Sequence, residues 1–272
     1  MDVDADGRAA GHILTDLGFV VGRSGDDVHG SAPVVPEMWV PGTTSLRTSI
    51  LATWVDHVSG LVAIGALAPR VPVTLELDVH VYEQAPAGGT VHAVSRLVKA
   101  GRSVVVCGVD LTDHDGRPVA IGTASFMAAP DPGLELPRHI SLEAMPVTQG
   151  RLRRPFAERA GCRRREPGVA VLPRSEDGLN AAGTVNGGLI ALAVEEAALS
   201  LTPGATLSSM ALRYLRPVRS GPAVATAEVR AGLGRVEVRD AGGDDRPAVT
   251  ATTRAVGWPG PADSVTATAH AV

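Results

Sequence analysis

The sequence predicts an α+β protein built from two similar halves, each with one buried helix followed by antiparallel strands. Each half contains one long apolar segment, and each continues into short runs that alternate apolar and polar residues. Two turn signals also recur at a common offset: Gly88 and Gly221 are 133 positions apart, and so are Gly101 and Gly234. A shared offset across two turns indicates a duplicated domain.

The predicted strands show the two-residue period of half-buried β-structure most clearly in the run 73–82. A tight turn is expected at Gly101-Arg102, and a matching one at Gly234-Arg235. The other predicted strands are 90–99, 103–112 and 118–127 in the first half, and 206–216, 223–230, 236–240 and 248–256 in the second.

Each half also contains a segment that predicts a buried helix. The first, 45–67, contains a single acid, Asp56, and the second, 187–201, contains two, Glu195 and Glu196. A helix that is apolar nearly all round must be buried on most of its circumference. We therefore expect two antiparallel sheets, each wrapped around a long central helix, which are related by a pseudo-twofold axis and joined at their edge strands. Because adjacent helical residues point about 100° apart, we also expect either Glu195 or Glu196 to reach solvent.

The domain boundaries follow from this repeat and from proline content. Several prolines between 130 and 155 mark a linker. We expect an N-terminal domain at 1–130, a linker at 131–150, a C-terminal domain at 151–258 and a tail at 259–272.

Composition excludes several functional classes. With 272 residues, 44% of them hydrophobic, and a net charge of −4, the chain is expected to be globular and to bind neither nucleic acid nor a membrane. Its acidic first residues do not resemble a signal peptide, which predicts a cytoplasmic protein. Nucleotide-binding glycine motifs and metal-ligand spacings are absent from the sequence. Cys107 and Cys162 are expected to be free thiols, with Cys107 in the core.

Asp56 is the first candidate for chemistry. A carboxylate in a buried helix needs a partner or a function, because burial of an unpaired charge is costly. One interpretation is that the helix turns Asp56 to solvent or pairs it with His57. The other is a carboxylate placed in a cleft as a general base or nucleophile.

The segment from Asn180 to Gly188 is the second candidate. Two glycines, Gly187 and Gly188, stand at the start of the second helix, where backbone N–H groups and the helix dipole can bind an anion or a developing oxyanion. An ordinary N-cap by Asn186 followed by two permissive glycines explains the same pattern without a ligand.

These residues give the second half a resemblance to the PaaI-type hotdog thioesterases. That family's motif has an Asn, then His-Gly-Gly, and an acid about two helical turns later. In this chain the pattern falls on Asn180, Asn186, Gly187-Gly188 and Glu195, with Asn186 where the family usually has His. Asn keeps a donor but cannot titrate near neutral pH.

The first half resembles the same family through 54–59, 73–77 and 99–103, but it has lost the glycine motif. Pro41, Arg47, Thr48 and Ser49 stand at those places. The resemblance implies a double hotdog, in which each active site takes the glycine motif from one half and the acid from the other.

Two composite sites are therefore implied. The first would combine Asn180, Asn186 and Gly187 with Asp56, with Thr74 eighteen residues after the acid. The second would combine Glu195 with Pro41, Arg47 and Thr48, and is expected to be degenerate. Residues expected to contact substrate at the first site are Gly188, Gly101 and Arg102. We expect the Asp56 carboxylate to lie within about 8 Å of the Gly187 amide nitrogen, which leaves room for a thioester carbon and a water. At the second site, we expect Glu195→Gln to be silent, with turnover unchanged.

The implied activity is hydrolysis of an acyl-CoA or acyl-carrier thioester, with CoA as part of the substrate and no cofactor or metal. The arrangement also allows a homodimer of double hotdogs. The arginines between 151 and 165 are interpreted as a solvated face, with a CoA phosphate contact as the alternative. A non-catalytic acyl-CoA-binding or regulatory hotdog is the main rival function, and a dehydratase or lyase is the second.

Overall fold

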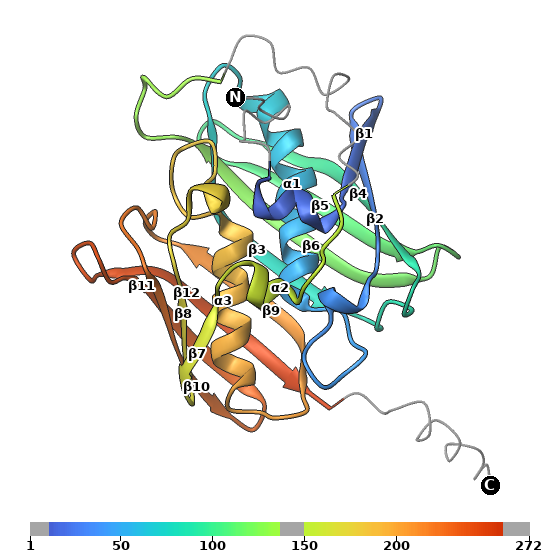
Figure 1. Ribbon diagram of the computed structural model, residues 1–272. Helices are drawn as coiled ribbons and strands as arrows, with labels where there is room; N and C mark the ends of the chain where they lie inside the picture. Colours follow the sequence, from blue (N-terminus) through green and yellow to red (C-terminus); the bar gives the residue numbers. More distant parts are fainter. Residues whose placement is uncertain (1–10, 137–149, 258–272) are drawn as a thin grey trace, which may run out of the picture.

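The computed structural model describes residues 11–136 and 150–257. Two long helices lie on one face of a curved antiparallel sheet, side by side in the centre of the molecule (Figure 1). The elements of the first half are η1 (Ile13–Leu17), β1 (Val20–Ser24), β2 (Asp27–Pro33), η2 (Pro36–Met38), α1 (Thr48–Leu67), β3 (Pro72–Val81), β4 (Thr90–Ala100), β5 (Val105–Asp113) and β6 (Pro118–Ala128).

The second half repeats this order. Its elements are α2 (Phe156–Arg159), β7 (Arg163–Glu166), β8 (Val169–Leu172), η4 (Glu176–Gly178), α3 (Gly187–Leu199), β9 (Thr206–Tyr214), β10 (Ala223–Arg230), β11 (Leu233–Asp240) and β12 (Pro247–Val256). Each half thus has one long helix and a sheet that curves around it, which confirms the double hotdog.

The strands form one 12-stranded sheet, in the order β1-β2-β4-β5-β6-β3-β9-β12-β11-β10-β8-β7, so the sheets of the two halves are joined at their edge strands as expected. One feature of the sheet differs from the expectation. Each half has two strands before its helix, which the sequence did not predict. Strands β1, β7 and β8 have four or five residues, too few to show a period, and β7 is exposed along its whole length. Strand β2 alternates in burial over seven residues, but its buried positions are Val28, Gly30 and Ala32, so its apolar signal is weak.

The two halves join through β3 and β9, which pair antiparallel. Asp78 pairs with Ala211, 133 positions later, which is the offset found in the sequence repeat. Because each of these residues pairs with its own counterpart, the pseudo-twofold axis passes through this pair. Arg213 also reaches across the junction, with its Nη1 2.5 Å and its Nη2 3.2 Å from the Asp78 carboxylate.

Helices α1 and α3 run antiparallel and pack closely. A Cβ added to Gly188 at the start of α3 would lie 2.3 Å from the Thr53 Oγ1 of α1, so only glycine permits this approach. The length and composition of α1 would also suit a membrane-spanning helix. In the fold, however, Trp54, Val55 and Val58 are almost completely buried, as expected of a hotdog's central helix.

One predicted turn is misplaced. Gly101 lies in the loop between β4 and β5, where its N–H donates to Val104 O at 2.8 Å. Gly234 and Arg235, by contrast, lie inside β11, and the turn of the second half is at Ala231 and Gly232. Both of these residues have positive φ, 49° and 76°, as in the two-residue hairpin turns that match strand twist. The second hairpin is therefore shorter, and Gly101 and Gly234 are not equivalent. Arg96 of β4 pairs with Gly108, whereas Val229, 133 positions later, pairs with Gly234.

Two segments outside the long helices and main strands make contacts that bear on the domain boundaries. Residues 134–136 pair with 69–71 of the first half. The η1 segment packs on the second half, where His12 Nε2 lies 2.9 Å from Leu179 O and Arg159 forms an ion pair with Asp16. The boundaries proposed from sequence stay predictions, because most of the linker (137–149) and the whole tail fall outside the described residues.

Candidate active site

The start of α3 is held by Asn186. Its Oδ1 accepts a hydrogen bond from Gly188 N at 2.8 Å, and its own N–H donates to Gly178 O at 3.0 Å. Asn186 is therefore the N-cap of α3, and its side chain is almost completely buried. The capping role that the sequence left as an alternative is present. A capped helix start also leaves a positive backbone end for negative charge nearby.

Gly187, the first residue of α3, faces the acid from the other half. A Cβ built on Gly187 would lie 3.5 Å from Asp56 Oδ2 and 3.1 Å from the hydroxyl oxygen of Tyr214. Since a Cβ is about 2.5 Å from its own backbone nitrogen, this carboxylate oxygen lies within about 6 Å of the Gly187 nitrogen. The separation is inside the expected 8 Å.

Thr74 holds the Asp56 carboxylate from the sheet. Its hydroxyl donates to Asp56 Oδ1 at 2.9 Å, and both residues are half-buried. Thr74 lies on β3 and Asp56 on α1, so the packing of this helix on its own sheet brings the two together. The site therefore combines an acid and a hydroxyl from the first half with a helix N-terminus from the second.

Asn180 is engaged within its own loop. Its Oδ1 accepts hydrogen bonds from Ala182 N at 3.0 Å, Thr184 N at 3.1 Å and Thr184 Oγ1 at 3.1 Å. These contacts shape the turn that leads into the Asn186 cap. A direct role of Asn180 toward substrate stays a prediction.

The three residues expected to contact substrate differ in placement. The N–H of Gly188 is taken by Asn186, and its α-carbon lies against Thr53, so its contacts give it a packing role. Gly101 and Arg102 form the tip of the β4–β5 hairpin, where Arg102 is exposed. Val105, just after this tip, pairs with Phe126, which in turn pairs with Thr74. The hairpin tip therefore lies at the Thr74 end of the sheet, and its role in substrate binding stays a prediction.

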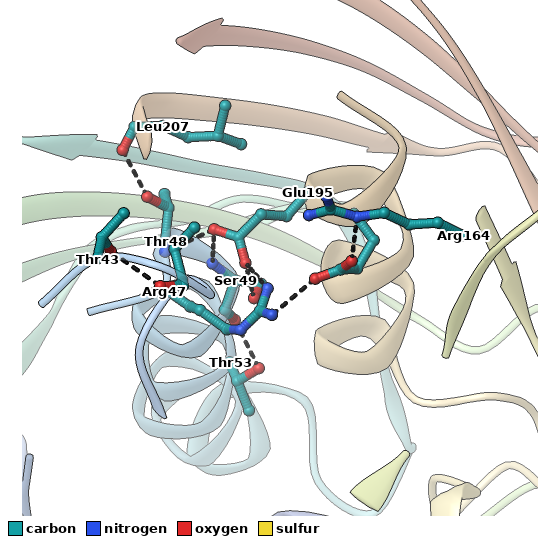
Figure 2. Close-up of polar contacts among 10 residues, drawn as sticks. Thr43, Arg47, Thr48, Ser49, Thr53, Arg164, Glu195 and Leu207 are labelled. Atoms are coloured by element: carbon teal, nitrogen blue, oxygen red, sulfur yellow. Dashed lines mark hydrogen bonds and ion pairs between the residues drawn. The ribbon is translucent and has the colours of Figure 1, made fainter. Parts of the chain in front are cut away.

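The second composite site has the same layout but is closed. Glu195 of α3 faces the N-terminus of α1, as Asp56 faces that of α3, and both pairs are offset by 139 positions (187 − 48 and 195 − 56). Here the carboxylate binds the helix end directly: Oε1 accepts from Thr48 N at 2.8 Å and from Ser49 N at 3.3 Å (Figure 2). Ser49 Oγ also donates to Oε2 at 2.6 Å.

Arg47 completes this closure. Its guanidinium lies 3.0 Å from Glu195 and 2.6 Å from Glu196, and Glu196 in turn pairs with Arg164 at 2.7 Å (Figure 2). Arg47 and Glu195 are completely buried. Although burial alone would lower the pKa of Arg47, the negative charges of Glu195 and Glu196 raise it above its ordinary value, so the arginine stays charged.

One expectation about this region needs correction. Both Glu195 and Glu196 are buried, at 0% and 5% exposure, so neither reaches solvent as expected. The reason is that Arg47 inserts between the helices and neutralises both acids. Glu195 makes four buried contacts of the kind that stabilise a charge, with Arg47 Nη1, Thr48 N, Ser49 N and Ser49 Oγ. We therefore expect Glu195→Gln to destabilise the fold, while its silence in turnover stays a prediction. Pro41, the counterpart of Asn180, is exposed.

The two thiols are free and buried. Burial raises the pKa of Cys107 to about 11, and burial together with the charge of Glu196 raises that of Cys162 to about 12. Neither has the thiolate character of a nucleophile at neutral pH. Among the described residues no cluster of His, Cys, Asp or Glu could hold a metal ion.

Tyr214, the last residue of β9, is a site residue that sequence reasoning missed. Its hydroxyl donates to Gly187 O at 3.0 Å. Burial, together with the charge of Asp56, raises the pKa of Tyr214 well above its usual range. The sequence placed it at the end of a predicted strand, but which helix that strand end would meet depends on the tertiary fold.

Comparisons with known proteins agree with this architecture. Residues 49–120, about a quarter of the chain, match the family model of the thioesterase superfamily. Across both halves the fold is similar to the 12:0-ACP thioesterase from Umbellularia californica, with a TM-score of 0.63 and 14% identity over 86% of this chain and 99% of that one. An acyl-ACP thioesterase from Bacteroides thetaiotaomicron is similar with a TM-score of 0.59 and 12% identity, over 85% of this chain and 98% of that one. A comparison with curated proteins finds no match.

Proposed function

We propose that the protein hydrolyses an acyl thioester at the composite site formed by Asp56, Thr74 and the start of α3. The observation that carries this proposal is the placement of Asp56 beside Gly187, two residues from different halves that meet across the domain interface. A carboxylate opposite a helix N-terminus can activate a nucleophile on one side of a carbonyl and stabilise negative charge on the other. The thioesterase match over 49–120 and the thioesterase neighbours in fold support the same reaction.

In the proposed reaction the carbonyl oxygen of the thioester accepts a hydrogen bond from Gly187 N–H. One such donor is typically worth ~3–4 kcal/mol of barrier. Asp56 removes a proton from water as the water oxygen bonds to the carbonyl carbon, and the C–S bond then breaks. The proton passes to the leaving sulfur, which gives a thiol and a carboxylic acid. Thr74 fixes the orientation of the carboxylate. Asp56 could equally attack the carbonyl itself, and the resulting anhydride would then be hydrolysed by water.

Asn186 favours a second candidate function, a non-catalytic acyl-CoA binder. It stands where the family usually has a His, and its Oδ1 is committed to the cap. A binder would use the helix N-terminus to hold the thioester carbonyl but would not hydrolyse the thioester. The two functions differ in one measurable property, the release of thiol.

The test is a panel of CoA thioesters with short, medium, long and aromatic acyl groups, followed by thiol release with a chromogenic reagent. We expect hydrolysis of at least one, and Asp56→Asn should lower its turnover by at least ~10²-fold, because it keeps side-chain volume but removes the base. Acyl-CoA affinity should change little. Asp110→Asn is the matched control, since this acid is on the surface in an exposed ion pair with Arg96.

Two results would contradict the proposal. Binding of several acyl-CoAs without any thiol release would establish the binder. Full turnover in Asp56→Asn would place the chemistry elsewhere.

The remaining features of the proposal concern partners and location. The thiol part of the substrate is proposed to be CoA or an acyl carrier, with no cofactor, metal or nucleic acid and no membrane contact. A homodimer of double hotdogs in the cytoplasm is the proposed form.

A further inference from the structure

We propose that Tyr214 is a positioning residue that clamps the start of α3 so that the Gly187 amide meets the substrate carbonyl in a fixed orientation. This inference rests on the proposed function and adds a residue from outside the glycine motif. Its basis is the hydrogen bond from the Tyr214 hydroxyl to Gly187 O, at 3.0 Å.

The clamp is needed because α3 begins with two glycines. Glycine has the largest backbone freedom of any residue, so a helix that starts with Gly187 and Gly188 has a loosely defined first turn. Asn186 restrains the Gly188 N–H, and Thr53 restrains the Gly188 α-carbon. Tyr214 supplies the restraint on Gly187 itself, through its carbonyl oxygen. A fixed donor costs no reorganisation when charge develops on the substrate oxygen.

Tyr214 also limits the space beside Gly187. A Cβ built on Gly187 would lie 3.1 Å from the Tyr214 hydroxyl oxygen and 3.3 Å from its Cζ. The same Cβ would lie 3.5 Å from Asp56 Oδ2. The hydroxyl oxygen and the carboxylate oxygen are thus within about 7 Å of each other. The tyrosine forms one wall of the space between acid and amide, and its raised pKa keeps the hydroxyl protonated and able to donate.

The second site provides an internal comparison. Tyr214 is the last residue of β9, and its counterpart 133 positions earlier is Val81, the last residue of β3, which has no hydroxyl. The helix that starts there begins with Thr48 and Ser49, which are less flexible than glycine, and its end is bound by Glu195. The hydroxyl is therefore present at the helix start that begins with two glycines, and absent at the one whose backbone N–H groups are bound by Glu195.

The test is Tyr214→Phe, which removes the hydroxyl and keeps the ring. We expect kcat to fall ~10-fold with KM within about twofold, because the interaction matters most when charge develops on the carbonyl oxygen. Tyr82→Phe is the matched control: Tyr82 is the only other tyrosine, and it is 56% exposed. Its kinetics should equal those of the unchanged protein.

A pair of inhibitors separates a positioning role from a structural one. Both are analogues of the acyl-CoA that is hydrolysed fastest: a plain thioether without the carbonyl, and a ketone with a methylene between carbonyl and sulfur. Only the ketone can accept a hydrogen bond from Gly187 N–H. The unchanged protein should bind the ketone more tightly, on the order of 10-fold, and Tyr214→Phe should reduce this preference while binding the thioether equally well.

The outcomes are distinct. Equal weakening of both analogues in Tyr214→Phe would mean that the hydroxyl only maintains the fold, which overturns the clamp. An unchanged preference for the ketone would overturn it as well. If the unmodified protein neither hydrolyses an acyl-CoA nor prefers the ketone, then the proposed function fails first, and the clamp fails with it.

Discussion

The starts of α1 and α3 occupy equivalent places in the two halves, yet a buried ion pair fills the space at one and two glycines begin the other. At α1, Glu195 accepts two backbone N–H groups, and Arg47 fills the space beside it. At α3, glycines replace the side chains, and Asp56, held by Thr74, lies within about 6 Å of the Gly187 nitrogen.

The comparison suggests how a duplicated fold can keep one site for chemistry and use the other for stability. In a helix N-terminus the same positive backbone end can bind a substrate oxyanion or an internal carboxylate, but not both. Glu195 takes the place that a ligand would need. Because its charge is buried, Arg47 has to be buried with it.

The largest expected effect is on stability at the closed site. Arg47→Ala leaves Glu195 buried without its cation, and loss of one partner from a buried pair typically costs ~3–5 kcal/mol. We expect the free energy of unfolding in urea to fall by that amount. Arg96→Ala, which breaks exposed ion pairs, is the control and should change it by less than about 1 kcal/mol. Similar losses in the two variants would mean that the closed site does not stabilise the fold.

A smaller effect is expected for Glu195→Gln. The amide keeps the shape and one oxygen acceptor for Thr48 N, but it loses the charge that Arg47 faces. We expect ~1–3 kcal/mol of destabilisation, measured by urea unfolding, and a kcat per folded molecule within about twofold of the unchanged value. A loss of kcat as large as that of Asp56→Asn would show that the closed site takes part in the reaction.

Much of the fold and the main pair of the first composite site could be predicted from sequence. The repeat offset of 133 indicated the duplication because it holds from β3 to β9 and from β4 to β10. It is lost after the shorter second hairpin, so the pair Gly101 and Gly234 was a coincidence of sequence. Asp56 and Gly187 could be paired because only the second half retained the glycine motif, so the one complete composite site had to take its acid from the first half. Thr74 followed from its spacing to the acid.

The features that escaped prediction all depend on tertiary contacts. Tyr214 meets Gly187 only because β9 ends beside the start of α3. The closure of the second site depends on Arg47 entering between two helices, and charge patterns in sequence favour exposure of such residues. Strands such as β7 and β8 have four residues each, too few to show a period.

The central claim, one working site per chain, is tested most directly by counting bound ligand. Isothermal titration of the full chain with the ketone analogue of its best acyl-CoA substrate measures the number of sites without turnover. One molecule per chain is the predicted result, since Glu195 and Arg47 fill the second helix start. Two molecules per chain with comparable affinity would contradict it.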